Sequence, residues 1–111
     1  MAAVDAIYVA GAESLHQVTD AIADQLQVPV STRRDLPFLQ VDERTRIDLY
    51  PDSDYPGQWI AEVYHAGEVA DRQALARRIY DHLVENTDWD LTLDSDDAAD
   101  IIASRIKSHT Q

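Results

Sequence analysis

Eight acidic side chains within a twenty-residue segment form the most concentrated chemical feature of this chain. No lysine or arginine interrupts residues 81–100, so the segment carries −8 of the net formal charge of −12. A surface of one charge sign accelerates association with a partner of the opposite sign, as small acidic inhibitors do with basic enzymes. The candidate contacts for a basic protein partner are Asp88, Asp90, Asp94, Asp96, Asp97 and Asp100. The alternatives are an ordinary solvated surface and mimicry of nucleic-acid phosphates.

Tyrosine and histidine side chains supply the remaining candidates. Tyr8, Tyr50 and Tyr64 fall on predicted strands, and tyrosine is enriched at partner surfaces because it buries much area at small entropic cost. His65, at the end of a predicted strand, is the only histidine that we would test as a general acid or base. Of the other histidines, His16 is expected at the start of a helix, His82 beside the apolar stripe of a helix and His109 in a terminal tail.

The sequence contains no recognisable constellation for catalysis, cofactor binding or metal binding. The chain has no cysteine, which excludes disulfides, zinc–thiolate sites and thiol nucleophiles. Its three glycines build no phosphate loop, and the acidic run at 94–97 lacks the glycine and the final glutamate of a calcium loop. The basic pair Arg33–Arg34 could grip an anion, although such a pair is more often a solvated loop. We therefore predict no catalytic residue, no metal site and no cofactor.

Composition and charge narrow the class of protein further. With 21 acidic and 9 basic side chains, the chain would repel phosphate backbones and anionic membranes, so we expect neither nucleic-acid nor membrane binding. A length of 111 residues and an apolar content of 45% fit one folded domain, residues 1–111. The apolar runs are too short to span a bilayer and the first residues lack the basic start of a signal peptide, which predicts a cytoplasmic protein.

Hydrophobic periodicity predicts the elements that position these residues. Alternating apolar and polar residues favour strands at 44–50 and 89–94, and short apolar segments ended by a glycine favour strands at 6–10 and 59–65. Helical spacing favours helices over 15–26, begun by a capping box of Ser14 and Gln17, and over 69–86. Pro29 and Pro37 indicate a connection over 28–39.

Fewer sequence signals support the second and third predicted helices than support the first. On helix 69–86 the apolar stripe is expected to comprise Leu75, Ile79, His82 and Leu83, whereas Arg72, Arg77 and Arg78 mostly face solvent. A third helix is expected after residue 94. Asp94 or Ser95 would cap it, and it would be anchored by Ile101, Ile102 and Ile106.

The order of these elements predicts an α+β fold of the ferredoxin-like kind. This β-α-β-β-α-β plait has a four-stranded antiparallel sheet with two helices on one face, here followed by an extra C-terminal helix. With strand order 4-1-3-2, the other face would carry Tyr8, Tyr50, Tyr64, Glu62 and several aspartates. The third helix, or a second copy of the chain in a homodimer, could cover that face.

Two functions fit these expectations. The first is a non-catalytic protein-interaction module of the inhibitor, immunity or adaptor type, which docks a basic partner. The second is a small-molecule-binding or enzymatic domain, dimeric through its sheet, with a pocket lined by Tyr8, Tyr50, Tyr64 and His65. The lack of a catalytic constellation favours the first.

Overall fold

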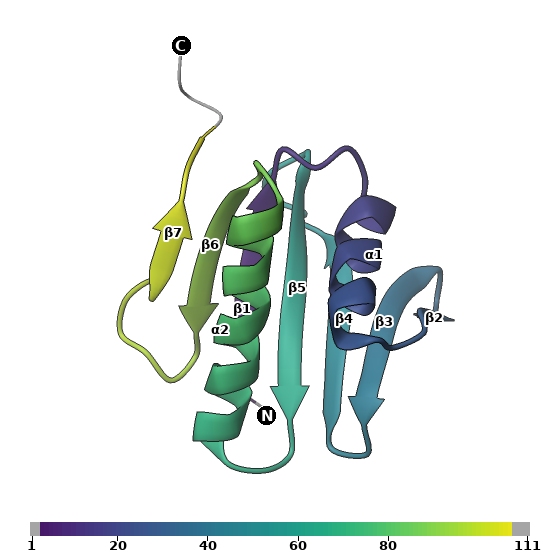
Figure 1. The fold of residues 1–111 in the computed structure, drawn as a ribbon, viewed down its shortest axis with the longest axis vertical. Coiled ribbons are helices and arrows are strands. Elements are labelled where there is room, and N and C mark those ends of the chain that lie inside the picture. Colours follow the sequence, from purple (N-terminus) through teal and green to yellow (C-terminus); the bar gives the residue numbers. More distant parts are fainter. Residues whose placement is uncertain (1–2, 108–111) are drawn as a thin grey trace.

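The computed structural model describes residues 3–107 as one seven-stranded antiparallel sheet with both helices on the same side (Figure 1). The strand order is β2-β3-β4-β5-β1-β6-β7. No helix in the described residues is long and apolar enough to cross a membrane. The elements are β1 (Asp5–Ala10), α1 (Leu15–Leu26), β2 (Ser31–Arg33), β3 (Leu36–Asp42), β4 (Thr45–Pro51), β5 (Gln58–His65), α2 (Val69–Asn86), β6 (Asp90–Ser95) and β7 (Ala103–Arg105).

The core lies between the sheet and the two helices. Alternate residues of the central strands point toward the helices, as the period-2 pattern predicts. Each of these side chains is at most 1% exposed: Ile7, Val9, Ile47, Leu49, Ala61, Val63, Leu91 and Leu93. Helix α1 packs on β3 and β4, and α2 packs on β1, β5 and β6 (Figure 1). Since nothing in residues 3–107 packs on the other side, most alternate strand residues there remain partly accessible, although Ala6 and Ile60 are buried among their neighbours.

The helices begin and pack largely as their sequence predicts. Ser14 Oγ accepts the Gln17 N–H at 3.1 Å, and Gln17 Oε1 accepts the Glu13 N–H at 2.7 Å, which confirms the capping box with the glutamine reaching one residue further back. On α2, Ile79 and Leu83 are buried as expected. The prediction that Arg72 faces solvent is wrong, because the residue is only 4% exposed.

The prediction of a ferredoxin-like plait is wrong. The sheet has seven strands rather than four, and two helices are present in the described residues rather than three. The four strands that the sequence predicts lie at its centre in the order β4-β5-β1-β6, and the error lies at the two edges.

The first edge is extended by a hairpin within the segment predicted to be a connection. Strands β2 and β3 pair around a two-residue loop of Arg34 and Asp35, whose φ angles of 53° and 67° are both left-handed, as in type I′ turns. Pro37 is tolerated in β3 because the ladder with β4 begins at Phe38, so that Pro37 faces only Thr32 of β2.

The second edge carries β7 where a third helix was expected. Residues 96–102 form a connection, and the predicted helix anchors Ile101, Ile102 and Ile106 are 60%, 38% and 49% exposed. Strand β7 is held instead by Arg105, whose guanidinium donates to three carbonyls at the end of α2 and the start of β6. Its acceptors are the carbonyl oxygens of Val84 at 3.1 Å, Thr87 at 2.8 Å and Trp89 at 3.0 Å. These contacts join distant segments, so the local sequence does not reveal them.

Candidate functional site

The side of the sheet away from the helices, called the open face, combines tyrosines with acids. Tyr8, Tyr50 and Tyr64 all lie on it and are half-buried against their strand neighbours. Their cross-strand and same-strand neighbours on this face include Asp48, Ile60, Glu62, Asp90, Thr92 and Asp94. The predicted open-face tyrosines therefore do share one surface.

A small hollow lies in the open face where a short side chain separates two acids. The strand register places Ala6 of β1 between Glu62 of β5 and Asp94 of β6. The hollow has a volume of about 80 Å³ and is lined by Val4, Ala6, Tyr8, Glu62, Asp94, Ser95 and Asp96. We call it the acidic hollow.

The carboxylates of the acidic hollow have only neutral hydrogen-bond donors among the described residues. Glu62 Oε1 accepts the Tyr64 hydroxyl at 3.0 Å, Asp94 Oδ1 accepts the Ser95 N–H at 2.9 Å, and Asp96 Oδ2 accepts the Val4 N–H at 2.9 Å. No ion pair joins any of the three acids to a cation within residues 3–107. Their negative charge is therefore not compensated locally.

The pKa values of the three tyrosines around Glu62 are all raised. Burial, and then the hydrogen bond and charge of Glu62, raise the pKa of Tyr64 to about 12. The same causes raise the pKa of Tyr50, and burial followed by Asp94 and Glu62 raises the pKa of Tyr8. All three phenols thus remain protonated at physiological pH, and the Tyr64 hydroxyl donates to Glu62.

The basic residue of this region is already engaged. Arg46 donates to both oxygens of Asp48, from Nε at 2.9 Å and from a terminal nitrogen at 3.2 Å. Its guanidinium also lies 4.8 Å from the centroid of the Tyr64 ring. Arg46 therefore offsets the charge of Asp48 and leaves the acidic hollow uncompensated.

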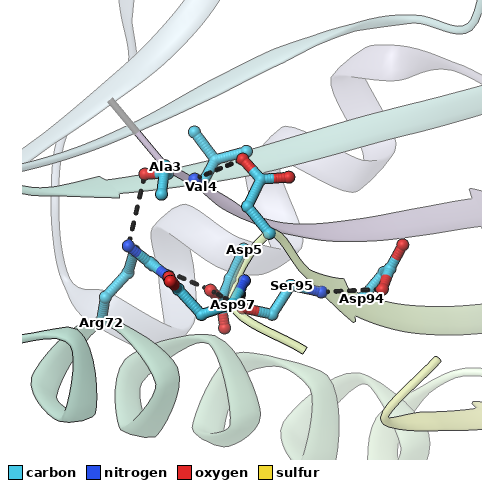
Figure 2. Close-up of polar contacts among 8 residues, drawn as sticks. Ala3, Val4, Asp5, Arg72, Asp94, Ser95 and Asp97 are labelled. Carbon is cyan, nitrogen blue, oxygen red and sulfur yellow. Dashed lines mark hydrogen bonds and ion pairs between the residues drawn. The ribbon is translucent and has the colours of Figure 1, made fainter. Parts of the chain in front are cut away.

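A buried ionic cluster lies on the helix side of the same strands, and Figure 2 shows Arg72 reaching from α2 to Asp5 of β1 and to Asp97. Arg72 Nε donates to Asp5 Oδ1 at 2.8 Å, and the same oxygen accepts the Ser95 hydroxyl at 2.7 Å. Arg72 also donates to the carbonyl of Ala3 at 3.4 Å. Burial alone would lower the pKa of Arg72, but hydrogen bonds to Asp97 and Asp5 outweigh it and raise that pKa. The cluster joins β1, β6, α2 and the β6–β7 connection.

The acids that were predicted to form one partner-binding surface lie at several separate positions in the structure. Asp94 and Asp96 lie in the acidic hollow with Tyr8, whereas Asp97 turns toward Arg72. Asp96 also donates its N–H to the Val4 carbonyl at 2.9 Å, so it continues the β1–β6 pairing instead of starting a helix. The predicted third helix, capped by Asp94 or Ser95, is wrong because Ser95 ends β6 and its hydroxyl binds Asp5.

The other predicted acids lie away from the hollow. Asp88 precedes β6, and its Oδ1 accepts Lys107 Nζ at 3.1 Å. Asp90 begins β6, and its Oδ1 accepts the Lys107 N–H at 2.6 Å. Asp100 is exposed in the β6–β7 connection. The structure therefore does not bring all the predicted acids together at the hollow, and their role in binding a partner stays a prediction.

His65 lies in a cluster at the ends of β4 and β5. Its Nδ1 is 2.8 Å from Thr45 Oγ1, and its Nε2 is 3.9 Å from Asp71 Oδ2, which is longer than a hydrogen bond. Gly67 leaves room for the ring, because a Cβ there would lie 2.6 Å from His65 Nε2. Thr45 is only 3% exposed, so its hydroxyl is not accessible to a substrate. A use of His65 as acid or base stays a prediction, and His109 lies outside the described residues.

Residues that matter here were missed by sequence reasoning, although signals for them exist. Asp5 shares the period-2 face of Ile7 and Val9, and a carboxylate on that buried face requires a cationic partner. Arg72 lies four residues before the buried Ala76 of α2 and so occupies the apolar stripe. Glu62 was placed on the open face but was not recognised as its central acceptor.

In the single chain, Tyr8, Tyr50, Tyr64 and His65 border three separate hollows, and a pocket enclosed between two copies of the chain stays a prediction. Tyr8 borders the acidic hollow, Tyr50 borders a second pocket toward β2, and Tyr64 and His65 border a third beside the β3–β4 turn. Within residues 3–107 no group of three or more histidine, aspartate or glutamate side chains is arranged to hold a metal ion. Comparison with known protein families, with curated proteins and with solved structures gives no match.

Proposed function

We propose that this protein is a non-catalytic interaction module that docks a basic segment of a protein partner on its open face. The observation that carries the proposal is the acidic hollow, in which the charges of Glu62, Asp94 and Asp96 meet only neutral donors among the described residues. A lysine or arginine side chain entering the hollow would supply the missing positive charge. Charge-assisted hydrogen bonds of this kind are shorter and stronger than neutral ones.

The surroundings of the hollow suit a protein partner. Tyr8 lines it, Tyr64 stands on the neighbouring strand β5 and Tyr50 on β4 beyond it, so a basic residue would enter beside aromatic surface. Tyrosine and arginine are over-represented among residues that dominate binding energy at interfaces. The hollow is too small for more than one side chain, which supports recognition of a cationic residue within a larger contact.

The decisive experiment compares two pairs of substitutions that change the net charge equally. Glu62→Gln with Asp94→Asn neutralises the hollow, while Asp20→Asn with Asp24→Asn neutralises two aspartates of α1 on the opposite side of the sheet. A fluorescent lysine- and arginine-containing peptide is titrated with each protein at low and moderate salt, and its anisotropy is measured. We expect the hollow variant to lose about tenfold or more in affinity, as for loss of one charged hydrogen bond.

Net charge alone would make the two paired variants equivalent. Equal losses in both, or an affinity for the peptide that does not change with salt, would rule out recognition by the hollow. Sedimentation of the same proteins reports whether the open face instead pairs two copies of the chain. A dimer that the hollow variant dissociates would assign the face to self-association and overturn the partner proposal.

A further inference from the structure

We propose that a second pocket, beside the β2–β3 turn, binds a small carboxylate that carries an apolar group about the size of one ring. The pocket has a volume of about 200 Å³ and lies toward the β2 edge of the open face, over β2, β3 and β4, whereas the acidic hollow lies over β5, β1 and β6. It is lined by Arg33, Arg34, Leu36, Pro37, Phe38, Asp48, Leu49 and Tyr50. We call it the arginine pocket.

The walls of the arginine pocket are apolar and accessible. Leu36 is 40% exposed, and Phe38 and Tyr50 are half-buried on the same face of the sheet. An apolar group placed in the pocket would remove this surface from water, which is the main source of affinity in small-molecule sites. Because drug-sized ligands occupy pockets of roughly 300–1,000 Å³, a volume of about 200 Å³ fits a smaller molecule.

Two arginines give the pocket its preference for an anion. Neither Arg33 nor Arg34 forms an ion pair with any described residue, although the chain has 21 acidic and only 9 basic side chains. The guanidinium of Arg33 lies 5.4 Å from the centroid of the Phe38 ring, so its charge is held against the apolar wall. The only acid of the lining, Asp48, is bound through both oxygens by Arg46.

The backbone supports an assignment to ligand binding. Arg34 and Asp35 both adopt left-handed φ angles, where glycine or asparagine would be less strained. The strain at Arg34 is explained if its side chain is needed at this position. A guanidinium matches the geometry of a carboxylate through two parallel hydrogen bonds, and the apolar walls select acids with a ring over simple anions.

The experiment follows backbone amide shifts of the whole protein by NMR while small probes are added. Phenylacetate carries both the ring and the carboxylate, acetate lacks the ring, and phenethylamine carries the opposite charge. We expect phenylacetate to shift amides at 33–36, 38 and 48–50 in a saturable manner, and the other two probes to leave those residues unchanged at the same concentrations. Equal shifts with acetate would show a simple anion site, and no saturable shift with phenylacetate would show no site; either result overturns the proposal.

Paired variants test the role of the two arginines. Arg33→Gln with Arg34→Asn removes both charges while placing at 34 a residue that accepts the left-handed conformation, so the hairpin remains folded. Arg44→Gln with Arg78→Gln changes the net charge equally, away from the pocket lining. We expect the first pair to weaken phenylacetate binding about tenfold or more, and the second pair to leave it unchanged. Equal losses in both pairs would assign the effect to net charge and refute the site.

Discussion

Replacing Arg72 with methionine tests whether the buried ionic cluster stabilises the fold. The substitution keeps an apolar stem in the α2 stripe but removes the cation that binds Asp5, whose side chain is 1% exposed. Only the Ser95 hydroxyl at 2.7 Å would remain as a hydrogen-bond donor to Asp5 Oδ1, and Asp5 Oδ2 already has no partner. Removing one member of a buried ion pair costs about 3–5 kcal/mol, because the other charge stays buried without compensation.

The expected effect is large compared with the stability of a domain of this size, which is about 5–15 kcal/mol. Urea unfolding followed by circular dichroism should show a lower midpoint with an unchanged slope. In a thermal melt the same loss corresponds to a decrease of roughly 12–20 °C, at about 4 °C for each kcal/mol. Asp97→Asn is the matched control, since that side chain is 38% exposed and its pairing should contribute only about 1 kcal/mol or less.

A double substitution separates the loss of charge pairing from the loss of packing. Asp5→Leu combined with Arg72→Met removes both buried charges, so the protein should regain most of the stability lost by Arg72→Met alone. A loss below about 1 kcal/mol in the single variant would show that Arg72 is not required to compensate Asp5. If the double variant loses at least as much free energy of unfolding as the two single variants lose in total, the two residues are not coupled.

Three further substitutions test the open face, the C-terminal strand and the first helix. Glu62→Gln should lower the pKa of Tyr64 from about 12, read from tyrosinate absorbance. Because the ordinary pKa of tyrosine is about 10, the folded phenol holds its proton more tightly than the unfolded one, and this stabilisation is complete below about pH 10 and is lost as pH rises toward 12. Arg105→Ala removes three hydrogen bonds from one guanidinium and should cost about 1.5–3 kcal/mol in urea unfolding, with faster amide exchange in β7. Ser14→Ala should cost about 1 kcal/mol through loss of the α1 cap, and an unchanged midpoint would show that the cap contributes nothing.

The sequence predicted those parts of the fold whose signals are local. Alternation identifies β4 and β6, and short apolar segments identify β1 and β5; the period of two residues along a strand then gives the side of each that faces the helices. The Ser14 capping box likewise depends on neighbours three residues apart. These signals suffice for the central sheet and the two helices, and they place the three candidate tyrosines on one face.

The two edges of the sheet depend on contacts that no short segment contains. A hairpin loop of Arg34 and Asp35 lacks the asparagine or glycine that normally indicates left-handed turn residues, and Pro37 suggests a break rather than a strand. In the same way, β7 is positioned by Arg105 binding carbonyls up to 21 residues earlier. Only the folded structure shows that Pro37 needs no hydrogen bond to β4. Likewise, only the folded structure shows that residues 103–105 form the last strand at the other edge of the sheet.

The acidic segment shows why charge along a sequence does not determine charge on a surface. Asp81, Asp88 and Asp97 lie in the −8 segment, yet each is paired with a cation from Arg77, Lys107 or Arg72. The uncompensated charge of the open face comes from Asp94 and Asp96 of that segment together with Glu62, which lies about thirty residues earlier and reaches the hollow through the β1–β5 register. Substituting Asp97 would therefore remove one partner of Arg72 on the helix side of the sheet and would leave the charge of the acidic hollow in place. The informative residues are those whose charges converge across strands, and their partner should be most sensitive to Glu62 and Asp94.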